Sequence, residues 1–276
     1  MTSVLVESTD LAEELIGDRP PVVLDVRWSL AGSDPDGYRA GHVPGSLFVD
    51  LDRDLAAPVG DGSGGRHPLP DPAALQAVWR RVGVRSSDGV VVYDAKDASA
   101  AARAWWLLRW SGLTDVRVLD GGMAAWTAAG LWVKAGGGTP LVPGTVKVRP
   151  GGMPTVDADE AGSLAAAGAL VDARAAARYR GEVEPMDPVA GHIPGAVNLP
   201  FTALLTDDGR FRPAAEIRSA FAAVGIRPGM TAAASCGSGV TACHLVLAGA
   251  VVGIDLALYP GSWSQWCALG GPVALR

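Results

Sequence analysis

The feature that most limits the possible folds of this chain is an internal repeat. The segment 22–27 (Val-Val-Leu-Asp-Val-Arg) recurs as 169–174 (Ala-Leu-Val-Asp-Ala-Arg). Further along, 41–46 (Gly-His-Val-Pro-Gly-Ser) recurs as 191–196 (Gly-His-Ile-Pro-Gly-Ala). The two pairs occur in the same order and at nearly the same spacing, which chance rarely produces. The chain is therefore predicted to contain two copies of one domain.

A third pair of segments distinguishes the two copies. The segment 89–94 (Gly-Val-Val-Val-Tyr-Asp) is the counterpart of 231–236, the strand residues before Cys236 together with Cys236 itself. Asp94 thus takes the place that Cys236 has in the second copy. Because only the second copy carries the cysteine, we expect the chemistry there and a catalytically inactive first domain.

Each half alternates short apolar runs, typical of buried strands, with helical stretches such as 72–82 and 100–110. This alternation favours an α/β fold in which each domain has a mostly parallel sheet flanked by helices. The segment 139–153 is rich in Gly and Pro and is predicted to be a linker. We therefore expect domains at 1–138 and 154–276.

The cysteine loop, residues 236–241 (Cys-Gly-Ser-Gly-Val-Thr), joins a predicted strand to a predicted helix. The unpaired N–H groups of the first helical turn and the positive end of the helix dipole stabilise an anion such as a thiolate. Gly237 and Gly239 allow the backbone to curl so that several N–H groups face the sulfur. The alternative is an inert buried cysteine, since free Cys is often only a small core residue.

The composition excludes several classes of protein. The chain has 276 residues, 49% of them hydrophobic and 19% charged, as in globular proteins. A net charge of −6 argues against nucleic acid and acidic membranes as partners. The three cysteines lack zinc-site spacing, so no metal site is expected, and no cofactor is predicted. No signal peptide is apparent and the longest apolar run, 245–254, is too short to span a membrane, so we predict a cytoplasmic protein.

Taken together, these motifs resemble the tandem-domain rhodanese family of sulfurtransferases over nearly the whole chain. The resemblance rests on the two Asp-x-Arg strands, the two Gly-His-x-Pro-Gly segments, the Asp-Gly-Gly-x-x-x-Trp segment at 120–126 and the cysteine loop. The cysteine loop is the most specific part and resembles that of the 3-mercaptopyruvate sulfurtransferases. The thiosulfate-preferring branch usually has basic residues in the two positions after the cysteine, where Gly237 and Ser238 are neutral.

The resemblance implies a double displacement at Cys236. Its thiolate would attack the sulfur of a small-molecule donor, become a persulfide, and pass that sulfur to cyanide, a thiol or thioredoxin. Backbone N–H groups around Gly237, Gly239, Val240 and Thr241 would stabilise the persulfide anion without a metal.

With 3-mercaptopyruvate as donor, the site would need a group that binds the donor carboxylate and a group that protonates the departing enolate. Arg178 matches the carboxylate-binding arginine of the family, although without the resemblance a surface arginine would be the simpler interpretation. The 3-mercaptopyruvate branch has a second arginine, which falls on Met186 in our alignment. One of the two carboxylate-binding arginines is therefore missing at that position. The resemblance further implies a relay of Ser238, His67 and Asp52 in a cleft between the domains. The alternative for His67 is an exposed loop histidine.

The remaining histidines and cysteines are interpreted structurally. His42 and His192 lie in the duplicated segments, of which only one copy is expected to react, so both are expected to be bonded within a turn. His244 and Cys243 are expected to pack in the core. Cys267 lies near the C-terminus and could be exposed.

Three alternatives stay open. The first is a thiosulfate:cyanide sulfurtransferase, which the neutral loop disfavours and Met186 favours slightly. The second is a cysteine phosphatase or arsenate reductase, which would need an arginine on the first helical turn where this chain has Ala242. The third is a non-catalytic sulfur carrier or binding module, against which the intact cysteine loop argues.

Overall fold

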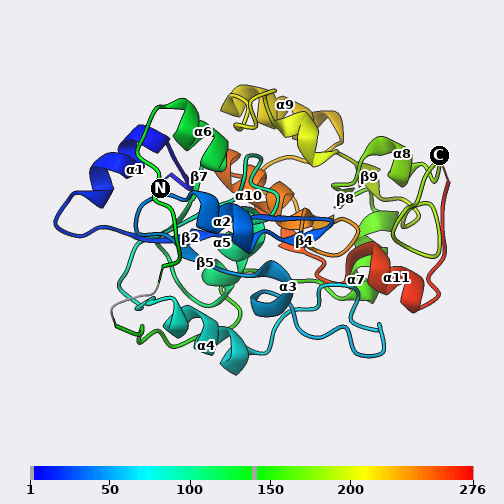
Figure 1. Ribbon diagram of the computed structural model, residues 1–276. Helices are drawn as coiled ribbons and strands as arrows, with labels where there is room; N and C mark the ends of the chain where they lie inside the picture. The colour runs from blue at the N-terminus through cyan, green and yellow to red at the C-terminus, as the bar shows by residue number, and fades with distance from the viewer. Residues whose placement is uncertain (1–2, 139–141, 276) are drawn as a thin grey trace. The chain divides into compact units, whose positions relative to one another are not determined.

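The computed structural model describes residues 3–138 and 142–275, which divide into two compact units (Figure 1). The first unit comprises the chain up to Ala57, Pro70–Met153 and Asp207–Phe211. The second comprises Pro58–Leu69, Pro154–Thr206 and the chain from Arg212 onward. Both units are thus assembled from segments that are not contiguous in the sequence.

The sheet of the first unit is entirely parallel. Its strand order is β1-β7-β6-β2-β5. The strands are β1 (Leu5–Val6), β2 (Val22–Asp25), β5 (Leu47–Phe48), β6 (Val90–Tyr93) and β7 (Val116–Leu119). The helices are α1 (Ser8–Leu15), α2 (Pro35–Ala40), α3 (Leu51–Asp54), α4 (Pro72–Arg81), α5 (Ala101–Trp110) and α6 (Gly122–Ala128), and a small antiparallel pair is formed by β3 (Trp28–Ser29) and β4 (Gly32–Ser33).

The second unit repeats this arrangement. Its parallel sheet has the order β11-β10-β8-β9. The strands are β8 (Leu170–Asp172), β9 (Val197–Asn198), β10 (Ala233–Ser235) and β11 (Ala257–Leu258). The helices are α7 (Ala158–Ala166), α8 (Ala176–Tyr179), the 3-10 helix η1 (Phe201–Leu204), α9 (Ala214–Ala223), α10 (Ala242–Val252) and α11 (Ser262–Ala268).

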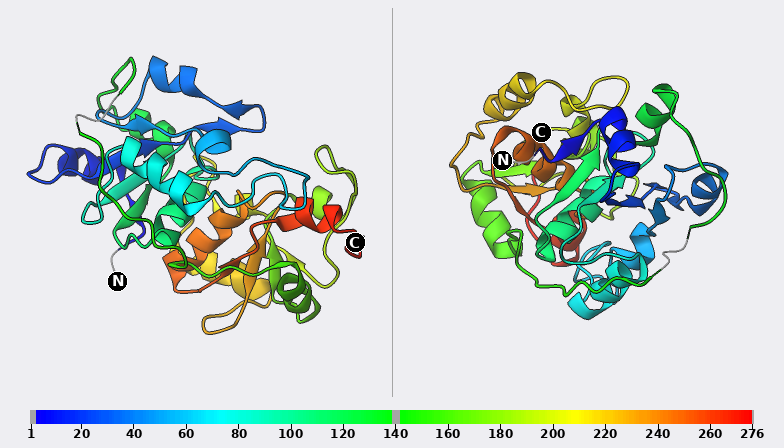
Figure 2. Two further views of the ribbon diagram at one scale, coloured as in Figure 1. Left: turned by 90° about the horizontal axis from the view of Figure 1, so that it is seen from below. Right: turned by 90° about the vertical axis from the view of Figure 1, so that its left-hand side faces the viewer.

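The residues of the central strands explain this architecture. All four residues of β6 and all three of β10 are buried, as expected for a parallel sheet that is covered on both faces. Two further views show helices on both sides of the sheets (Figure 2). The predicted α/β fold of two repeated domains is therefore confirmed.

The Asp-x-Arg motifs perform the same structural task in both units. Arg27 pairs with Asp25 at 2.7 Å and donates to the carbonyl of Gly41 at 2.6 Å. Arg174 pairs with Asp172 at 2.7 Å and donates to the carbonyl of Gly191 at 2.7 Å. Each motif thus ties the end of a central strand to the start of the Gly-His-x-Pro-Gly segment.

The two histidines of those segments are structural, as predicted. His42 Nδ1 lies 2.9 Å from the carbonyl oxygen of Tyr38, and the two rings stack. His192 Nδ1 lies 2.8 Å from the carbonyl oxygen of Tyr179, again with stacked rings. The partner carbonyls belong to helices α2 and α8, so the histidines bind these helices rather than their own turns.

The predicted linker and domain boundaries can be compared with the two units. Residues 139–141 of the linker lie outside the described residues. The rest of it follows the first unit, where Gly144 donates to the carbonyl of Arg80 and Arg149 to that of Ser111. Two short segments, 58–69 and 207–211, belong to the unit that is distant from them in sequence. The internal repeat could not predict this, because it depends on contacts between residues far apart in the chain.

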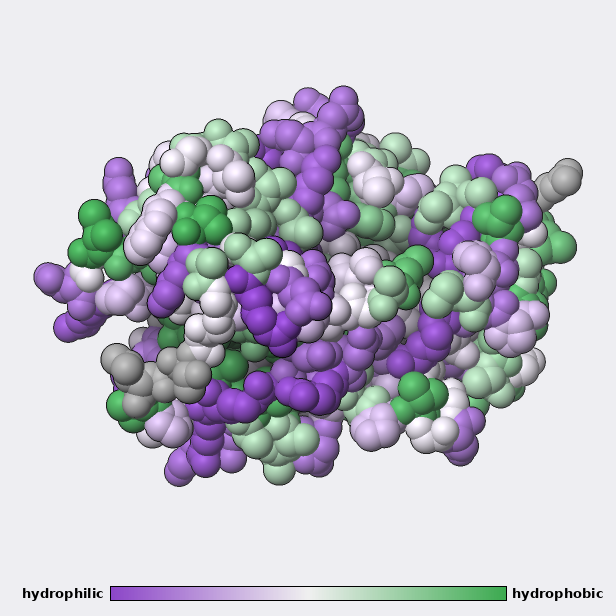
Figure 3. Space-filling view, viewed as in Figure 1, coloured by the Kyte–Doolittle hydropathy of each residue, from purple (hydrophilic) through white to green (hydrophobic). Residues whose placement is uncertain are grey.

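The surface is mixed in polarity. On the face shown in Figure 3, strongly hydrophobic residues are scattered among hydrophilic ones. In the described ranges, no helix has the length and hydropathy needed to cross a bilayer.

Candidate active site

The cysteine loop follows β10 and leads into α10, as the sequence predicts. Cys236 is only 2% exposed, and its Sγ accepts a hydrogen bond from the N–H of Gly239 at 3.1 Å. Gly239 has a φ of +78°, and a Cβ there would lie 2.1 Å from the carbonyl oxygen of Pro260. Only glycine can therefore occupy position 239 and direct its N–H at the sulfur.

The start of α11 holds the cysteine loop in place. The N–H of Trp263 donates to the carbonyl of Cys236 at 3.0 Å, and that of Ser264 donates to the carbonyl of Gly237 at 2.9 Å. In return, the N–H of Cys236 donates to Ser262 Oγ at 3.1 Å. These contacts fix the backbone on both sides of the sulfur.

Ser262 is a site residue that the sequence analysis missed. Its φ is +51°, a value that is uncommon for a residue with a side chain and is often associated with functional sites. Its hydroxyl accepts from Cys236 and donates to the carbonyl of Tyr259 at 2.8 Å. The repeat carried a signal, because the matching position in the first unit is Gly122, with a φ of +55°.

Two of the predicted relay residues lie together. His67 Nδ1 is 2.8 Å from Ser238 Oγ, and Ser238 is buried. His67 belongs to the segment 58–69, which is part of the second unit. The third predicted member, Asp52, lies in α3 of the first unit, where both carboxylate oxygens are 2.9 Å from Trp28 Nε1.

Arg178 is not a free surface arginine. It lies in α8, its side chain is 19% exposed, and its Nη2 is 2.5 Å from Glu184 Oε1 and 3.4 Å from Asp187 Oδ2. Burial acts to raise the pKa of Glu184, but hydrogen bonds from Arg178 and from the N–H groups of Met186 and Asp187 outweigh it and leave that pKa lowered. The guanidinium of Arg178 is therefore held in a defined orientation by the ionised Glu184 and by Asp187.

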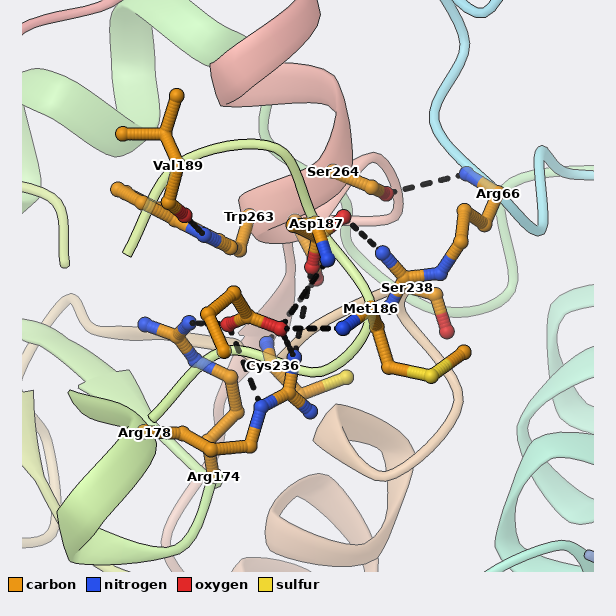
Figure 4. Close-up of polar contacts among 12 residues, drawn as sticks. Arg66, Arg174, Arg178, Met186, Asp187, Val189, Cys236, Ser238, Trp263 and Ser264 are labelled. Carbon is orange, nitrogen blue, oxygen red and sulfur yellow. Dashed lines mark hydrogen bonds and ion pairs between the residues drawn. The ribbon is translucent and has the colours of Figure 1, made fainter. Parts of the chain in front are cut away.

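Arg66 is the second basic residue of the site, and the sequence analysis missed it as well. It forms an ion pair with Asp187 through Nη1, and its backbone N–H donates to Ser264 Oγ at 3.0 Å. In Figure 4, Arg66 and Arg178 reach Asp187 from opposite sides. Its position directly before His67 was the available signal.

Position 237 lies beneath both arginines. A Cβ built on Gly237 would be 2.8 Å from Arg66 Nη2 and 3.5 Å from Arg178 Nη1. A side chain at position 237 would therefore meet the guanidinium of Arg66, which would have to shift. The residue after the cysteine, Gly237, is thus neutral, and the two positive charges near it belong to Arg66 and Arg178 of the same unit.

A third arginine completes the network behind these groups. Arg174 is nearly inaccessible, lies 3.4 Å from Glu184 Oε2, and stacks over the ring of Trp263 at 4.9 Å. Burial acts to lower its pKa, but Asp172 and the other nearby acids outweigh burial and leave that pKa raised. Arg174 therefore stays charged and fixes Glu184, which in turn orients Arg178.

The other cysteines and His244 take structural positions. Cys243 is buried on α10, and its Sγ lies 3.3 Å from the carbonyl oxygen of Gly239, so it packs in the core as predicted and also contacts the loop. His244 is buried with its ring edge against Phe201. Cys267 is half-buried, and burial raises its pKa to about 11, which disfavours a reactive thiolate. Over residues 3–138 and 142–275, no three His, Cys, Asp or Glu side chains form a group suited to a metal ion.

Comparison with known proteins identifies the family. The model of the rhodanese-like domain matches residues 8–129 and again 157–269. The chain therefore belongs to the rhodanese family, as the motifs indicated, with two copies of its domain.

Individual relatives define the class of enzyme. Two curated relatives carry provisional names. The thiosulfate sulfurtransferase SseB of Mycobacterium tuberculosis is 44% identical, and the match covers 95% of this chain and 93% of the relative. A 3-mercaptopyruvate sulfurtransferase of Pseudomonas aeruginosa is 49% identical, and the match covers 89% of this chain and 88% of the relative. Among solved structures, SseA from Escherichia coli, a 3-mercaptopyruvate sulfotransferase with the rhodanese fold, superimposes with a TM-score of 0.82 at 31% identity, covering 95% of this chain and 99% of that one. The chain is a sulfurtransferase.

Proposed function

We propose that this sulfurtransferase moves sulfur from 3-mercaptopyruvate to a thiophilic acceptor through a persulfide on Cys236. The observation that carries the proposal is the 2.8 Å contact between Ser238 and His67 in the same unit as the cysteine loop. A hydroxyl bonded to an imidazole can deliver a proton near neutral pH. Release of pyruvate needs such a proton, whereas release of sulfite from thiosulfate does not.

The first half-reaction breaks the carbon–sulfur bond of the donor. The Cys236 thiolate attacks the donor sulfur, a sulfur–sulfur bond forms, and the electron pair of the broken bond passes to the pyruvate enolate. Ser238 gives its proton to the enolate carbon and regains one from His67. The products are a Cys236 persulfide and pyruvate, and no oxidant or reductant is consumed.

The second half-reaction regenerates the thiolate. An acceptor nucleophile attacks the outer sulfur of the persulfide, the sulfur–sulfur bond breaks, and its electron pair returns to Cys236. The N–H of Gly239, 3.1 Å from Sγ, supports anion stabilisation at this position. In this mechanism the neighbouring backbone of Gly237, Val240 and Thr241 completes the cradle for the outer sulfur.

Several parts of the proposal stay predictions. Asp52 is expected to orient His67, and Arg178 to bind the donor carboxylate. Cyanide, small thiols and thioredoxin are the expected acceptors, and the cytoplasm is the expected location.

Thiosulfate is the second candidate donor. The relative from Mycobacterium tuberculosis is named for it. Two guanidinium groups in one unit would also suit a dianion. The neutral Gly237 and Ser238 argue against this donor, because no cation lies in the loop itself.

A comparison of donors tests the proposal. Purified protein is given 3-mercaptopyruvate or thiosulfate with cyanide as acceptor, and Cys236→Ser serves as the blank. We expect a much higher kcat/KM for 3-mercaptopyruvate. A preference for thiosulfate would replace the proposed donor, and folded protein that is inactive with both would overturn the persulfide mechanism.

A further inference from the structure

We infer that an open cavity on the first unit binds a free α-amino acid with an apolar side chain. The cavity has a volume of about 620 Å³ and is lined by Arg27, Asp34, Ala95 and residues of α6. Arg27 follows the end of β2 and Ala95 follows the end of β6, so the cavity lies at the carboxyl edge of the parallel sheet. Ligands of open α/β sheets bind at this edge. The inference goes beyond the proposed function and does not depend on the sulfur donor.

The first argument is the difference between the two units at this place. In the second unit, Trp263 packs over the guanidinium of Arg174 at 4.9 Å, and Arg174 Nη1 lies 3.4 Å from Glu184 Oε2. In the repeat, Met123 takes the place of Trp263 and Arg27 that of Arg174. Both Met123 and Arg27 line the cavity. The smaller side chain of Met123 thus leaves open a space that an indole ring fills in the second unit.

The second argument is that Arg27 has a donor to spare. Its Nε and Nη2 bind Asp25 and the carbonyl of Gly41, whereas Nη1 donates to none of the described residues. The side chain is only 10% exposed, so an unused N–H on it calls for a partner. Burial acts to lower the pKa of Arg27, but Asp25 outweighs burial and leaves that pKa raised. Arg27 is therefore a fixed cation that can bind a carboxylate.

The third argument is an anion on the same cavity. The backbone N–H of Asp34 donates to the carbonyl of Arg27 at 2.9 Å, which keeps the two residues adjacent. Asp34 Oδ1 accepts from the N–H of Gly37 at the start of α2, and Oδ2 accepts from none of the described residues. Since Arg27 pairs with Asp25 instead, the charge of Asp34 stays available to an ammonium group.

These two charges define the class of ligand. A free α-amino acid carries a carboxylate for Arg27 and an ammonium for Asp34 on a single carbon atom. A simple carboxylic acid would leave Asp34 without a partner, and a simple amine would leave Arg27 without one. A site with both charges therefore discriminates against ligands that carry only one of them.

The remaining wall favours an apolar side chain on that ligand. It consists of Ala95 together with Met123 and Ala124 of α6. The wall is held in place because the N–H of Met123 donates to the carbonyl of Asp94 at 2.9 Å and that of Ala124 to the carbonyl of Ala95 at 3.0 Å. Small-molecule sites commonly combine such an apolar lining with a few polar groups.

Calorimetric titration with three related probes tests the site. L-Leucine carries both charges, 4-methylpentanoate lacks the ammonium, and 3-methylbutylamine lacks the carboxylate. We expect L-leucine to bind saturably, with one molecule per chain, and each of the other two to bind at least about 10-fold more weakly. Folded protein that does not bind L-leucine, or that binds all three probes equally, would overturn the inference.

The variant Asp34→Asn removes one charge and retains a residue that caps α2 well. It should weaken L-leucine binding by about 10-fold and 4-methylpentanoate binding by less than about 2-fold. The matched control is Asp36→Asn, since Asp36 lies on the same helix and pairs with Arg39 at the surface, outside the cavity. Equal losses of L-leucine affinity in the two variants would contradict the role of Asp34. Arg27 is left intact, because its removal would leave Asp25 buried and unpaired.

Nuclear magnetic resonance of the methionine methyl groups locates the ligand and separates this inference from the proposed function. L-Leucine should shift the signal of Met123 and not that of Met186 in the second unit. The variant Met123→Trp, which imitates Trp263, should abolish binding. A shift at Met186 alone would overturn the inference. If Cys236→Ser binds L-leucine like the wild type, and the wild type is inactive with 3-mercaptopyruvate, the proposed donor is wrong and the amino-acid site stands.

Discussion

The loops after β6 and β10 occupy matching places in the two units but are filled differently. In the first, Asp94 is buried and its carboxylate accepts four backbone hydrogen bonds, from the N–H groups of Lys96, Ala98, Ala100 and Ala101, at 2.9 to 3.1 Å. In the second, Cys236 Sγ accepts one hydrogen bond from the described residues, that of the Gly239 N–H. The same strand–loop–helix geometry therefore cradles an anion in both units, and the first unit fills its cradle with its own side chain.

In the proposed mechanism, this difference explains why only the second unit of the duplicated chain reacts. The Asp94 carboxylate occupies four N–H groups that a substrate would otherwise use. A sulfur held by one N–H leaves the rest of the loop backbone for a second sulfur atom. Duplication thus preserves the frame, and the residue at one position decides whether the cradle is structural or available for chemistry.

Among substitutions that test this difference between the two units, the largest loss of sulfur transfer is expected at Cys236. Cys236→Ser should lower sulfur transfer by roughly 10³-fold or more with every donor, because a hydroxyl at neutral pH is a far weaker nucleophile than a thiolate. The rate of thiocyanate formation from cyanide measures it.

The matched variant in the other unit is Asp94→Cys, which should not restore transfer when combined with Cys236→Ser. Lys96 takes the place of Ser238 in the first unit, so a cysteine at position 94 would have no Ser238–His67 pair. Activity surviving Cys236→Ser alone would contradict the mechanism.

The next effect concerns the proton. His67→Ala should lower kcat with 3-mercaptopyruvate by about 10²-fold and affect thiosulfate much less, because only the enolate must be protonated. Asp52→Asn should produce a smaller loss with the same donor dependence if Asp52 orients His67. Equal losses with both donors would show that His67 positions the loop instead.

The stability of the first unit should respond to pH through Asp94. Burial, reinforced by the nearby Asp97, raises the pKa of Asp94 to about 6 despite hydrogen bonds from Ala101, Ala100 and Lys96. The folded state therefore binds this proton more tightly than the unfolded state, whose carboxyl titrates near 3.8. Asp94 contributes stability at low pH, and that contribution is lost as the pH rises from about 4 through 6, at about 1 kcal/mol per pH unit.

Urea unfolding at several pH values measures this effect by comparison with Asp94→Asn. The pKa of Asp120 is also raised to about 6, with burial as the main cause, and burial raises the pKa of Asp187, so the wild-type curve alone would combine several groups. The difference in unfolding free energy between wild type and Asp94→Asn isolates the contribution of Asp94. We expect the advantage of the wild type to grow between pH 6 and 4, and a constant difference would refute the assignment.

The parts of the structure that sequence could predict are local or duplicated. Residues 22–27 and 169–174 predicted strands because their apolar runs and their repetition are visible in the sequence, and the cysteine loop was placed between strand and helix for the same reason. Arg66 was missed because its meeting with Gly237 depends on the segment 58–69 joining the second unit. Such contacts come from tertiary packing, which no short-range pattern encodes.

The smallest effect is expected at Ser262, whose counterpart in the first unit is Gly122. Both residues have a positive φ, +51° at Ser262 and +55° at Gly122. Ser262→Ala keeps the unfavourable backbone and loses the hydrogen bonds to Cys236 and Tyr259, so it should lower the unfolding free energy by about 1 to 2 kcal/mol. Ser262→Gly loses the same bonds but relieves the strain, as Gly122 does in the first unit, and should be the more stable variant by about 1 kcal/mol. Thermal and urea unfolding of the two proteins decide the point. If Ser262→Gly is no more stable than Ser262→Ala, the serine is not strained, and its presence beside Cys236 reflects hydrogen bonding alone.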